Sequence, residues 1–487
     1  MNLKKILRKN KADRYIFILT VLFLVSLPIS RFFICDTIIG QGSYYHIRIA
    51  EEIIKTGVPT YDKLSGSNYT FNPLHLLLAF FIYIAGTKAT SIAFPFIFGI
   101  ASLLLYLRIL KKLHFDPASK MTASLLLVSS PIFLYTFSTI NAFLLPVFFN
   151  LLGFYFFVRD DGRFLFFQES RLNFYISILI FSFIPFFGVF NILITIALLL
   201  AYSCFEKNKL KNFYFLTFIL LLISLIYSTT LYPFFFQEKF TLTMGLLTNL
   251  IFQLGAKTGF RIFILLLSLI GFFKLWSDKN KRISIFIFLL LFFASLFLSN
   301  LLFYLNFLIA IPAACGLLTL LKMKWRVRLI KNLTLLILIS GLLISSILSI
   351  AQFSTSSPDN QLINALLWLR SYSGGGRVLS HPSNSFWIQK IANKPTFADP
   401  TLQGSLFYAN RFNITEQIFY SRNLEKTSFL LTDNNISYIF IDPEMKYGKV
   451  WTRQGHGLLF LLENSETFKK IYDHNDIEIW KLEDILG

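Results

Sequence analysis

The residues best suited to chemistry lie in one polar stretch, GQGSYYHIRIAEEIIKTGVPTYDKLSGSNYTFNP, which covers residues 40–73. Within it, Tyr44, Tyr45, His46 and Arg48 are close together in the sequence. A guanidinium group binds phosphate oxygens through two parallel charge-assisted hydrogen bonds, and histidine and tyrosine side chains can add others. His46 and Arg48 are therefore candidates to contact a phosphate-bearing substrate, and Tyr44 and Tyr45 are candidate substrate-binding residues beside them.

Several residues of this stretch also have a purely structural interpretation. Arg48 is four residues before Glu52, so the two can form an ion pair on a solvated helix surface. His46 can pack at the seam between the helix and a membrane. Asp62 lies in the turn sequence TYDK, where aspartate is common because its carboxylate bonds to nearby backbone amides. The sequence leaves these alternatives open.

A short amphipathic helix is expected to hold these side chains. Ser43 can cap it, and Gly57, with Pro59 just beyond, can end it. Aliphatic side chains fall on one helix face and polar side chains on the other. The apolar face has Ile47, Ala50, Ile53 and Ile54, and the polar face has Tyr44, Arg48, Glu51, Glu52 and Lys55. We expect the helix to lie flat on a membrane surface, with its polar face toward a ligand.

The composition places most of the chain in a membrane. Of its 487 residues, 55% are hydrophobic and 15% are charged, whereas soluble proteins carry about 25% charged residues. The net charge of +20 arises in short basic clusters between apolar segments, a pattern typical of cytoplasmic loops. This distribution argues against a nucleic-acid-binding face. Cys35, Cys204 and Cys315 show no disulfide or metal-ligand spacing.

The apolar segments predict about eleven membrane crossings in the cell membrane, with a cytoplasmic N-terminus and an external C-terminus. The expected spans are residues 15–34, 90–107, 122–136, 143–158, 173–185, 188–204, 213–231, 260–274, 283–297, 301–321 and 333–351. Residues 74–86 are too short to cross the membrane. We interpret them as a partly embedded piece of an external loop over residues 35–89, because a crossing there would place the later basic clusters outside.

The chain changes character after residue 352, where apolar runs become shorter and turn residues more frequent. Residues 437–442 and 470–482 alternate as strands do, and residues 364–373 are typical of a helix. The predicted fold is therefore mostly α: a polytopic helix bundle over residues 1–352 and a small external α/β domain over residues 353–487.

Two passages resemble the catalytic subunits of oligosaccharyltransferases and related GT-C glycosyltransferases. They are YYHIRIAEEIIKTGVPTYDKLS, after the first span, and WLRSYSGGGRVLSHPSNSFWIQKIANKPTFADP, at residues 368–400. The resemblance implies a GT-C-like bundle with an external C-terminal domain. It also implies transfer of a sugar or oligosaccharide from a polyprenyl-phosphate-linked donor in the membrane, with a divalent metal, Mg²⁺ or Mn²⁺, held by acidic loop residues.

The chain departs from this family at the family's acidic positions. Gln41, Gly42 and Ser43 precede the tyrosine pair, where the family has a carboxylate, and the second external loop, FSTINA at residues 137–142, has none. Gln253 stands at the acidic position of a later loop. The family's WWDYG acceptor motif is replaced by HPSNSF at residues 381–386. The metal ligands and the peptide-acceptor site are therefore not carried over, and the metal and the acceptor stay unknown.

Two other carboxylates are candidates for the catalytic role. Asp36, at the outer end of the first span, can act as a displaced general base or metal ligand, or it can be an exposed interfacial carboxylate. Glu238 can replace the acidic residue expected at Gln253, or it can pair with Lys239 in a loop. Gln253 itself is a candidate contact to the donor.

Three functions follow from these observations. The first is a glycosyltransferase with a non-peptide or altered acceptor. The second is a catalytically silent relative that binds a lipid-linked glycan or serves as a partner subunit. The third, a lipid-carrier transporter, is disfavoured because the spans are nearly free of the ionisable residues that transport pathways usually carry.

Overall fold

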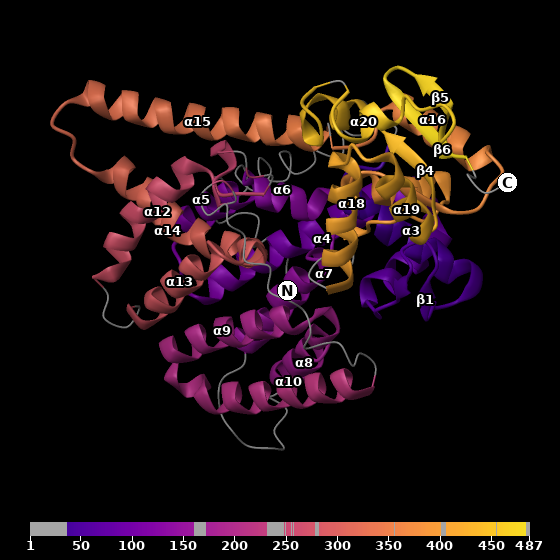
Figure 1. Cartoon of the computed structure of the whole chain (residues 1–487). Coiled ribbons are helices and arrows are strands. Elements are labelled where there is room, and N and C mark those ends of the chain that lie inside the picture. The colour runs from indigo at the N-terminus through magenta and orange to yellow at the C-terminus, as the bar shows by residue number, and fades with distance from the viewer. Residues whose placement is uncertain are drawn as a thin grey trace.

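The computed structural model describes residues 37–159, 172–230, 248, 250–254, 256, 258–277, 282–354, 356–400, 406–453 and 455–483. This part of the chain is mostly helical, with one four-stranded sheet near the C-terminus. In Figure 1 the long helices run side by side across the picture, and the C-terminal elements lie at one end of them.

The apolar part of the chain folds into a helix bundle, because a helix satisfies its own backbone hydrogen bonds where no water is available. Four of the described helices are long and apolar enough to cross a membrane, or five if one bent pair counts as a span, and five further apolar helices are shorter. These helices place the chain in a membrane. The bundle comprises α4 (Pro73–Lys112), α5 (Pro117–Val128), α6 (Pro131–Ser138), α7 (Leu144–Arg159), α8 (Leu172–Phe181), α9 (Val189–Phe205), α10 (Leu210–Thr230), α12 (Ile262–Trp276), α13 (Arg282–Ser295), α14 (Leu302–Lys322) and α15 (Arg328–Ser354).

Most predicted spans coincide with these helices to within a few residues, but the expected span over residues 122–136 is not one straight helix. It consists of α5 and α6, which are bent by 65°. Pro131 causes the break because proline has no backbone N–H and disfavours helical backbone in the preceding residue. Ser130 restarts the helix by accepting a hydrogen bond from the N–H of Phe133 at 3.2 Å. The first predicted span, residues 15–34, lies outside the described residues.

The segment 74–86, predicted not to cross, forms the first part of α4. The helix is interrupted at Gly86, where φ is +76° and ψ is 166°. Glycine adopts this left-handed φ without the steric cost that a Cβ atom brings. The break therefore separates residues 73–85 from the apolar helix that follows, whereas α4 as a whole is long and apolar enough to cross a membrane. That residues 74–86 do not cross stays a prediction.

The C-terminal elements form the expected mixed α/β fold. The sheet has the order β3-β4-β6-β5, in which β3 and β4 are parallel and the other pairs are antiparallel. The tight turn between β5 and β6 has positive φ at both Asn475 and Asp476, as a two-residue hairpin turn requires. The elements are α16 (Asn360–Ser371), β3 (Arg377–Leu379), α17 (Ser385–Trp387), α18 (Leu406–Tyr420), α19 (Leu424–Asp433), β4 (Ile436–Ile441), α20 (Leu458–Leu461), β5 (Phe468–His474) and β6 (Ile477–Leu482).

Helix α3 (Gln41–Thr56) joins the bundle to the C-terminal elements. Ile47 and Ala50 belong to the apolar core of the bundle. Tyr44 belongs instead to a core cluster with Leu366 and Val378 of the C-terminal part. The expectation that the polar face of this helix is open is therefore corrected, because Tyr44 and Arg48 are buried as well. The first half of the helix, up to Ala50, is therefore covered on two sides, whereas Ile54 and Lys55 near its end are exposed.

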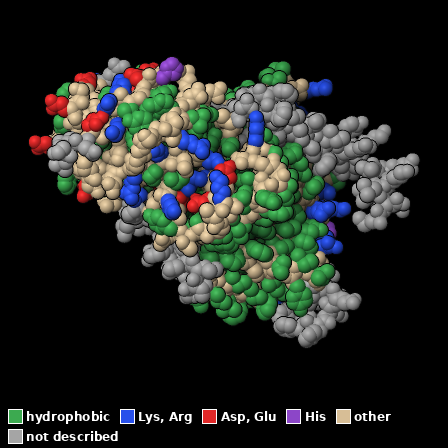
Figure 2. All heavy atoms as spheres, turned by 90° about the vertical axis from the view of Figure 1, so that its right-hand side faces the viewer, with side chains coloured by type: hydrophobic (Ala, Val, Ile, Leu, Met, Phe, Trp, Pro, Cys, Tyr) green, Lys and Arg blue, Asp and Glu red, His purple; other side chains and the backbone are tan. Residues whose placement is uncertain are grey.

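The molecular surface has a part rich in charged side chains and a part rich in hydrophobic ones. On the face turned to the viewer in Figure 2, charged side chains gather in the upper part, where the C-terminal elements lie. Hydrophobic side chains cover much of the bundle below. The polar face of the molecule that can meet a soluble ligand is thus at the end of the bundle that carries α3 and the sheet.

Candidate active site at the start of helix α3

Two loops predicted to be external meet at the start of α3. The N–H of Ile140 donates to Oγ of Ser43 at 3.0 Å, and this hydroxyl donates to the carbonyl of Ile39 at 2.7 Å. The sequence analysis expected Ser43 to cap the helix, and this expectation is wrong. The N-cap is Gly40, whose φ is +83°. A Cβ atom there would also lie 3.1 Å from Thr139, so glycine lets the two loops approach closely.

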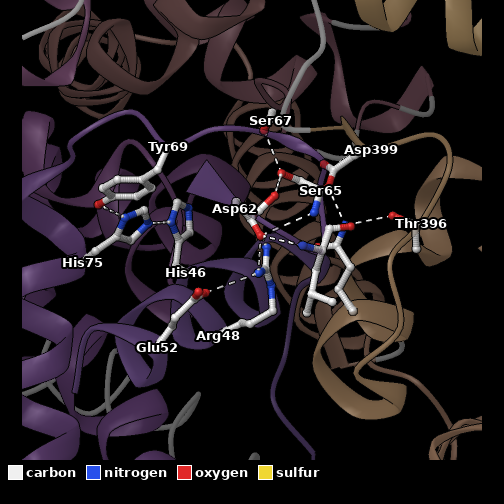
Figure 3. Close-up of polar contacts among 12 residues, drawn as sticks. His46, Arg48, Glu52, Asp62, Ser65, Ser67, Tyr69, His75, Thr396 and Asp399 are labelled. Atoms are coloured by element: carbon white, nitrogen blue, oxygen red, sulfur yellow. Dashed lines mark hydrogen bonds and ion pairs between the residues drawn. The ribbon is translucent and has the colours of Figure 1, made fainter. Parts of the chain in front are cut away.

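Arg48 of α3 and Asp62 of β1 (Tyr61–Asp62) form a buried bidentate ion pair. The nitrogen–oxygen distances are 2.8 and 2.5 Å (Figure 3). Burial opposes the charge of Asp62, but the hydrogen bonds and charge of Arg48 outweigh it and hold the pKa of Asp62 below its usual value. Burial likewise opposes the charged form of Arg48, and Asp62 outweighs it and raises the pKa of Arg48. Both side chains are therefore charged at neutral pH.

Arg48 and Asp62 also make the structural contacts that the sequence analysis left open for them. Arg48 approaches Glu52 at 3.9 Å, the predicted pair four residues apart. Asp62 accepts hydrogen bonds from the N–H groups of Leu64 at 3.1 Å and Ser65 at 3.4 Å, as expected of a turn aspartate. A phosphate group could reach the terminal nitrogens of Arg48 only if Asp62 released at least one of them.

His46 lies in a buried chain of hydrogen bonds rather than at the membrane seam. Its Nδ1 is 2.8 Å from Nε2 of His75, and Nδ1 of His75 is 2.8 Å from the hydroxyl of Tyr69 (Figure 3). Burial lowers the pKa of His46 to about 4, so its ring is neutral at pH 7. The sequence analysis missed His75 and Tyr69. The only signal was a lone histidine at the start of the apolar segment PLHLLLAF.

Tyr45 connects this chain of rings to the C-terminal elements. Its ring centroid is 5.2 Å from that of His46 and 5.5 Å from that of Phe386. Phe386 belongs to the segment HPSNSF that replaces the acceptor motif of the resembled family. In the same segment, Asn384 is buried and donates to the carboxylate of Asp442 at 2.8 Å. The segment thus packs against helix α3 and into the domain core.

The loop after α3 is attached to the C-terminal elements by further hydrogen bonds (Figure 3). The carbonyl of Leu64 accepts from the N–H of Thr396 at 3.2 Å, and Nε2 of Gln389 donates to Oγ1 of Thr396 at 2.8 Å. Gln389 also donates to the buried carboxylate of Asp399. These residues come from the passage 368–400, so the two passages of the sequence resemblance meet in space.

A second link to the C-terminal elements runs through Glu51 of α3. Its carboxylate pairs with Nζ of Lys390 and accepts a hydrogen bond from Thr87 at 2.9 Å. Thr87 directly follows the break of α4 at Gly86. Glu51 therefore connects the C-terminal part to the broken bundle helix, and it is not simply a solvated residue of the helix face.

Gln253 and Arg261 lie in the loop before α12, and their side chains contact α15 and the bend between α5 and α6. The exposed side chain of Gln253 accepts from the N–H of Ile262 at 3.1 Å and donates to Ser345 at 3.3 Å. Arg261 is fully buried and donates to the carbonyls of Leu342, at 3.1 Å, and of Ser129. The sequence analysis did not single out Arg261, although an arginine that directly precedes an apolar run was a visible signal.

The described residues do not fit the divalent metal that the resemblance implies. Among them, no group of three or more His, Cys, Asp or Glu side chains is placed to hold an ion. The loops that meet at Ser43 and Ile140 contribute amide and hydroxyl side chains there, such as Asn141. Both carboxylates proposed for catalysis, Asp36 and Glu238, lie outside the described residues.

Comparison with solved structures shows that the chain has the fold of GT-C glycosyltransferases. It matches the apo oligosaccharyltransferase of Archaeoglobus fulgidus with a TM-score of 0.66 and 16% identity, over 98% of this chain and 75% of that one. The archaeal oligosaccharyltransferase AglB from Archaeoglobus fulgidus, in complex with an inhibitory peptide and a dolichol-phosphate, matches with a TM-score of 0.66 and 14% identity, over 97% and 74%. ArnT from Cupriavidus metallidurans bound to undecaprenyl phosphate matches with a TM-score of 0.53 and 10% identity, over 94% and 97%.

The sequence itself gives no such match. No protein-family model matches it, and a search of curated proteins finds no similar sequence. At 10 to 16% identity, the likeness to these structures establishes a shared fold.

Proposed function

We propose that this protein transfers a sugar or oligosaccharide from a polyprenyl-phosphate-linked donor to a non-peptide or altered acceptor at the external face of the cell membrane. The observation that carries the proposal is a fold shared along nearly the whole chain with two proteins solved with a polyprenyl phosphate. It is supported by the meeting of two loops beside α3, both predicted to be external, next to the C-terminal elements.

In the proposed topology, about eleven crossings leave the N-terminus in the cytoplasm and residues 353–487 outside. The position of charged helix ends supports this orientation. Lys112 ends α4, Lys322 ends α14 and Arg328 begins α15, whereas α15 leads into the C-terminal elements at its other end. Basic residues therefore gather away from the candidate site, on the side that the positive-inside pattern assigns to the cytoplasm.

The reaction forms a bond between an acceptor atom and the anomeric carbon, and it breaks the bond from this carbon to a phosphate oxygen of the donor. The acceptor proton passes to a base, and the phosphate leaves with the electron pair. We assign the base to Asp36 or Glu238. No step is routed through a metal, since the described residues do not fit one.

The described residues of the site have positioning roles in this proposal. The Arg48–Asp62 pair and the hydrogen bonds of Leu64 fix the loop after α3 under the C-terminal elements. Gln253, whose side chain is exposed, is the candidate contact to the donor. Tyr45 and Phe386 place the HPSNSF segment at the site. Because this segment lacks the residues of the family's acceptor motif, it supports an acceptor different from a peptide sequon.

A transfer assay tests the proposal. Membranes that contain the protein are incubated with radiolabelled polyprenyl-phosphate-linked sugars, with and without Mg²⁺ or Mn²⁺, and the transferred label is measured. We expect product from the natural protein and a loss of at least about 100-fold in Asp36→Asn or Glu238→Gln, the usual scale of a lost general base. Glu444→Gln, at a carboxylate that is 75% exposed, is the matched control. The absence of product with every donor would contradict the proposal.

The second candidate function is a catalytically silent relative that binds a lipid-linked glycan or serves as a partner subunit. The lack of a carboxylate directly before the tyrosine pair, at residues 41–43, and in the second loop, at residues 137–142, favours it. Binding of labelled polyprenyl phosphate without turnover, unchanged in Asp36→Asn and Glu238→Gln, would support this function over transfer. A lipid-carrier transporter finds less support, because the cavity described below is lined almost wholly by apolar side chains.

A further inference from the structure

The bundle contains an apolar cavity of about 360 Å³, and the residues that line it differ from those of the candidate active site. Helices α4, α7, α9, α12, α13 and α14 surround it. Its wall is formed by aliphatic and aromatic side chains, which include Ile109, Val147, Leu198, Phe288 and Ile311. An apolar cavity of even about 150 Å³ stays dry and takes up a hydrocarbon ligand. The cavity is therefore suited to a hydrocarbon chain rather than to a sugar or a phosphate.

The polar groups deep in this cavity are already bonded to the protein. Asn150 accepts from Thr195 at 2.7 Å and donates to the carbonyl of Pro146 at 3.0 Å. The hydroxyl of Tyr304 donates to Oδ1 of Asn191 at 2.5 Å. These bonds tie α7, α9 and α14 together, and they occupy the hydrogen-bonding groups that would otherwise attract the polar part of a ligand. The deep end thus favours a ligand without polar groups.

The cavity opens to the outside at a mouth on the side of the bundle opposite to the C-terminal elements. His114, just after α4, and Phe205, the last residue of α9, line it and are exposed. Val147 and Tyr304 are buried at its inner part. The cavity therefore runs from this end of the bundle inward.

Basic residues adjoin this mouth. Lys111 and Lys112 directly precede the lining residue Leu113, Lys274 precedes Leu275, and Arg282 begins α13. All four basic side chains are exposed, and among the described residues near this end they outnumber the acidic residues Asp116 and Glu206. An apolar pocket with a basic rim matches a ligand that has a hydrocarbon chain and an anionic head group.

We propose that this cavity binds one acyl chain of an anionic phospholipid, whose phosphate is held by Lys111, Lys112, Lys274 and Arg282. The ligand is a lipid of the leaflet at the basic end. It differs from the polyprenyl donor, whose phosphate belongs at the opposite end of the bundle in the proposed function. The bound chain fills a space between six helices, so it stabilises the bundle.

Lipid binding to the full-length protein in detergent tests this inference. Dioleoyl-phosphatidylglycerol, dioleoyl-phosphatidylcholine and undecaprenyl phosphate are titrated separately, and bound lipid is counted by native mass spectrometry, with the melting temperature measured in parallel. We expect phosphatidylglycerol to bind at least about tenfold more tightly than phosphatidylcholine, and to raise the melting temperature. Each lysine near the head group contributes roughly fivefold to this preference.

Two variants with matched controls make the test specific. Ala201→Phe fills the cavity and should abolish phosphatidylglycerol binding, whereas Ala351→Phe, at an exposed position of α15, should leave it unchanged. Lys111→Gln with Lys112→Gln should reduce the preference for phosphatidylglycerol, whereas Lys324→Gln should not. The double variant leaves the cavity lining intact, so it remains informative if Ala201→Phe fails to fold.

Three results would overturn the inference: equal binding of the two phospholipids, unchanged phosphatidylglycerol binding in folded Ala201→Phe, or loss of undecaprenyl phosphate binding in that variant while phosphatidylglycerol stays bound. The last result would assign the cavity to the polyprenyl donor. The measurements need no sugar transfer, so a failed transfer assay and a failed lipid-binding assay remain distinguishable.

Discussion

Arg48 and Asp62 face each other in a bidentate ion pair with nitrogen–oxygen distances of 2.8 and 2.5 Å, although 14 residues separate them. The pair joins α3 to the loop that follows it, and both side chains are buried. Its carboxylate also accepts the backbone N–H of Leu64, whose carbonyl is bonded to Thr396. The candidate site is therefore organised by a structural ion pair, in which an arginine that could have bound a substrate phosphate is occupied.

Asp62→Asn should lower the free energy of unfolding by about 3–5 kcal/mol, because it leaves the guanidinium of Arg48 buried without its counter-charge. Arg48→Lys should also destabilise the protein, since an ammonium group cannot form the two parallel bonds. Thermal denaturation in detergent measures both. Glu444→Gln breaks an exposed pair with Lys449 and should change the stability by no more than about 0.5 kcal/mol. Equal effects of Asp62→Asn and Glu444→Gln would show that the buried pair has no structural role.

The stability should fall below pH 6.5 because of His46. Its pKa is about 6.5 in an unfolded chain and is lowered by burial to about 4 in the folded protein. Between these values the unfolded state binds a proton that the folded state excludes. The contribution is complete above pH 6.5, and it is lost at about 1.4 kcal/mol per pH unit as the pH falls toward 4.

Melting temperatures recorded from pH 7 to 4.5 test this dependence. His46→Gln should reduce the slope, since glutamine keeps a hydrogen-bonding group beside His75 without titrating. Part of the slope should remain, because burial also lowers the pKa of His75. His474→Gln, at an exposed position of β5, should keep the slope of the natural protein. An unaltered slope in His46→Gln would mean that this ring does not titrate differently in the two states.

Gly316→Ala should destabilise the bundle by about 1–3 kcal/mol, the range for overpacking a close contact. A Cβ atom at Gly316 of α14 would lie 2.0 Å from the carbonyl oxygen of Leu267 in α12, and one at Gly271 would lie 1.8 Å from that of Pro312. Both neighbours are backbone atoms, so relief requires the helices to move apart. Gly375→Ala is the control, because its Cβ would have no neighbour within 4 Å. The melting temperature in detergent should drop only in the first variant.

The effects of Glu51→Gln and Lys390→Gln should not add. The two side chains pair across the junction between α3 and the C-terminal elements, so a double-mutant cycle should give a coupling energy above about 0.5 kcal/mol. The same cycle on the exposed pair Lys449 and Glu444 should give a value near zero. Limited proteolysis of the C-terminal part should become faster in either single variant. Strict additivity at Glu51 and Lys390 would show that this contact does not hold the junction.

The sequence alone determined where most bundle helices and three strands of the C-terminal sheet lie. Long apolar runs are sufficient to predict bundle helices, because each helix satisfies its own hydrogen bonds, and the alternation of residues 437–442 was enough to predict β4. The position of α3 and its end at Gly57 were also predictable, since they depend on residues close together in the chain. Proline explains why the prediction failed at residues 122–136, where the run of apolar residues concealed the break before Pro131.

Only the tertiary structure decided the partners of the functional residues. Whether Arg48 meets Glu52, Asp62 or a ligand depends on where the loop after α3 returns, and that is fixed by contacts with residues more than 300 positions later, such as Thr396 and Lys390. His46 similarly met His75 only because α4 begins beside α3. Local patterns specify elements through backbone geometry, whereas side-chain pairing across elements depends on packing that no local pattern encodes. The sequence therefore determined a membrane helix bundle with one polar end, and the fold decided that the buried charges of Arg48 and Asp62 are paired with each other.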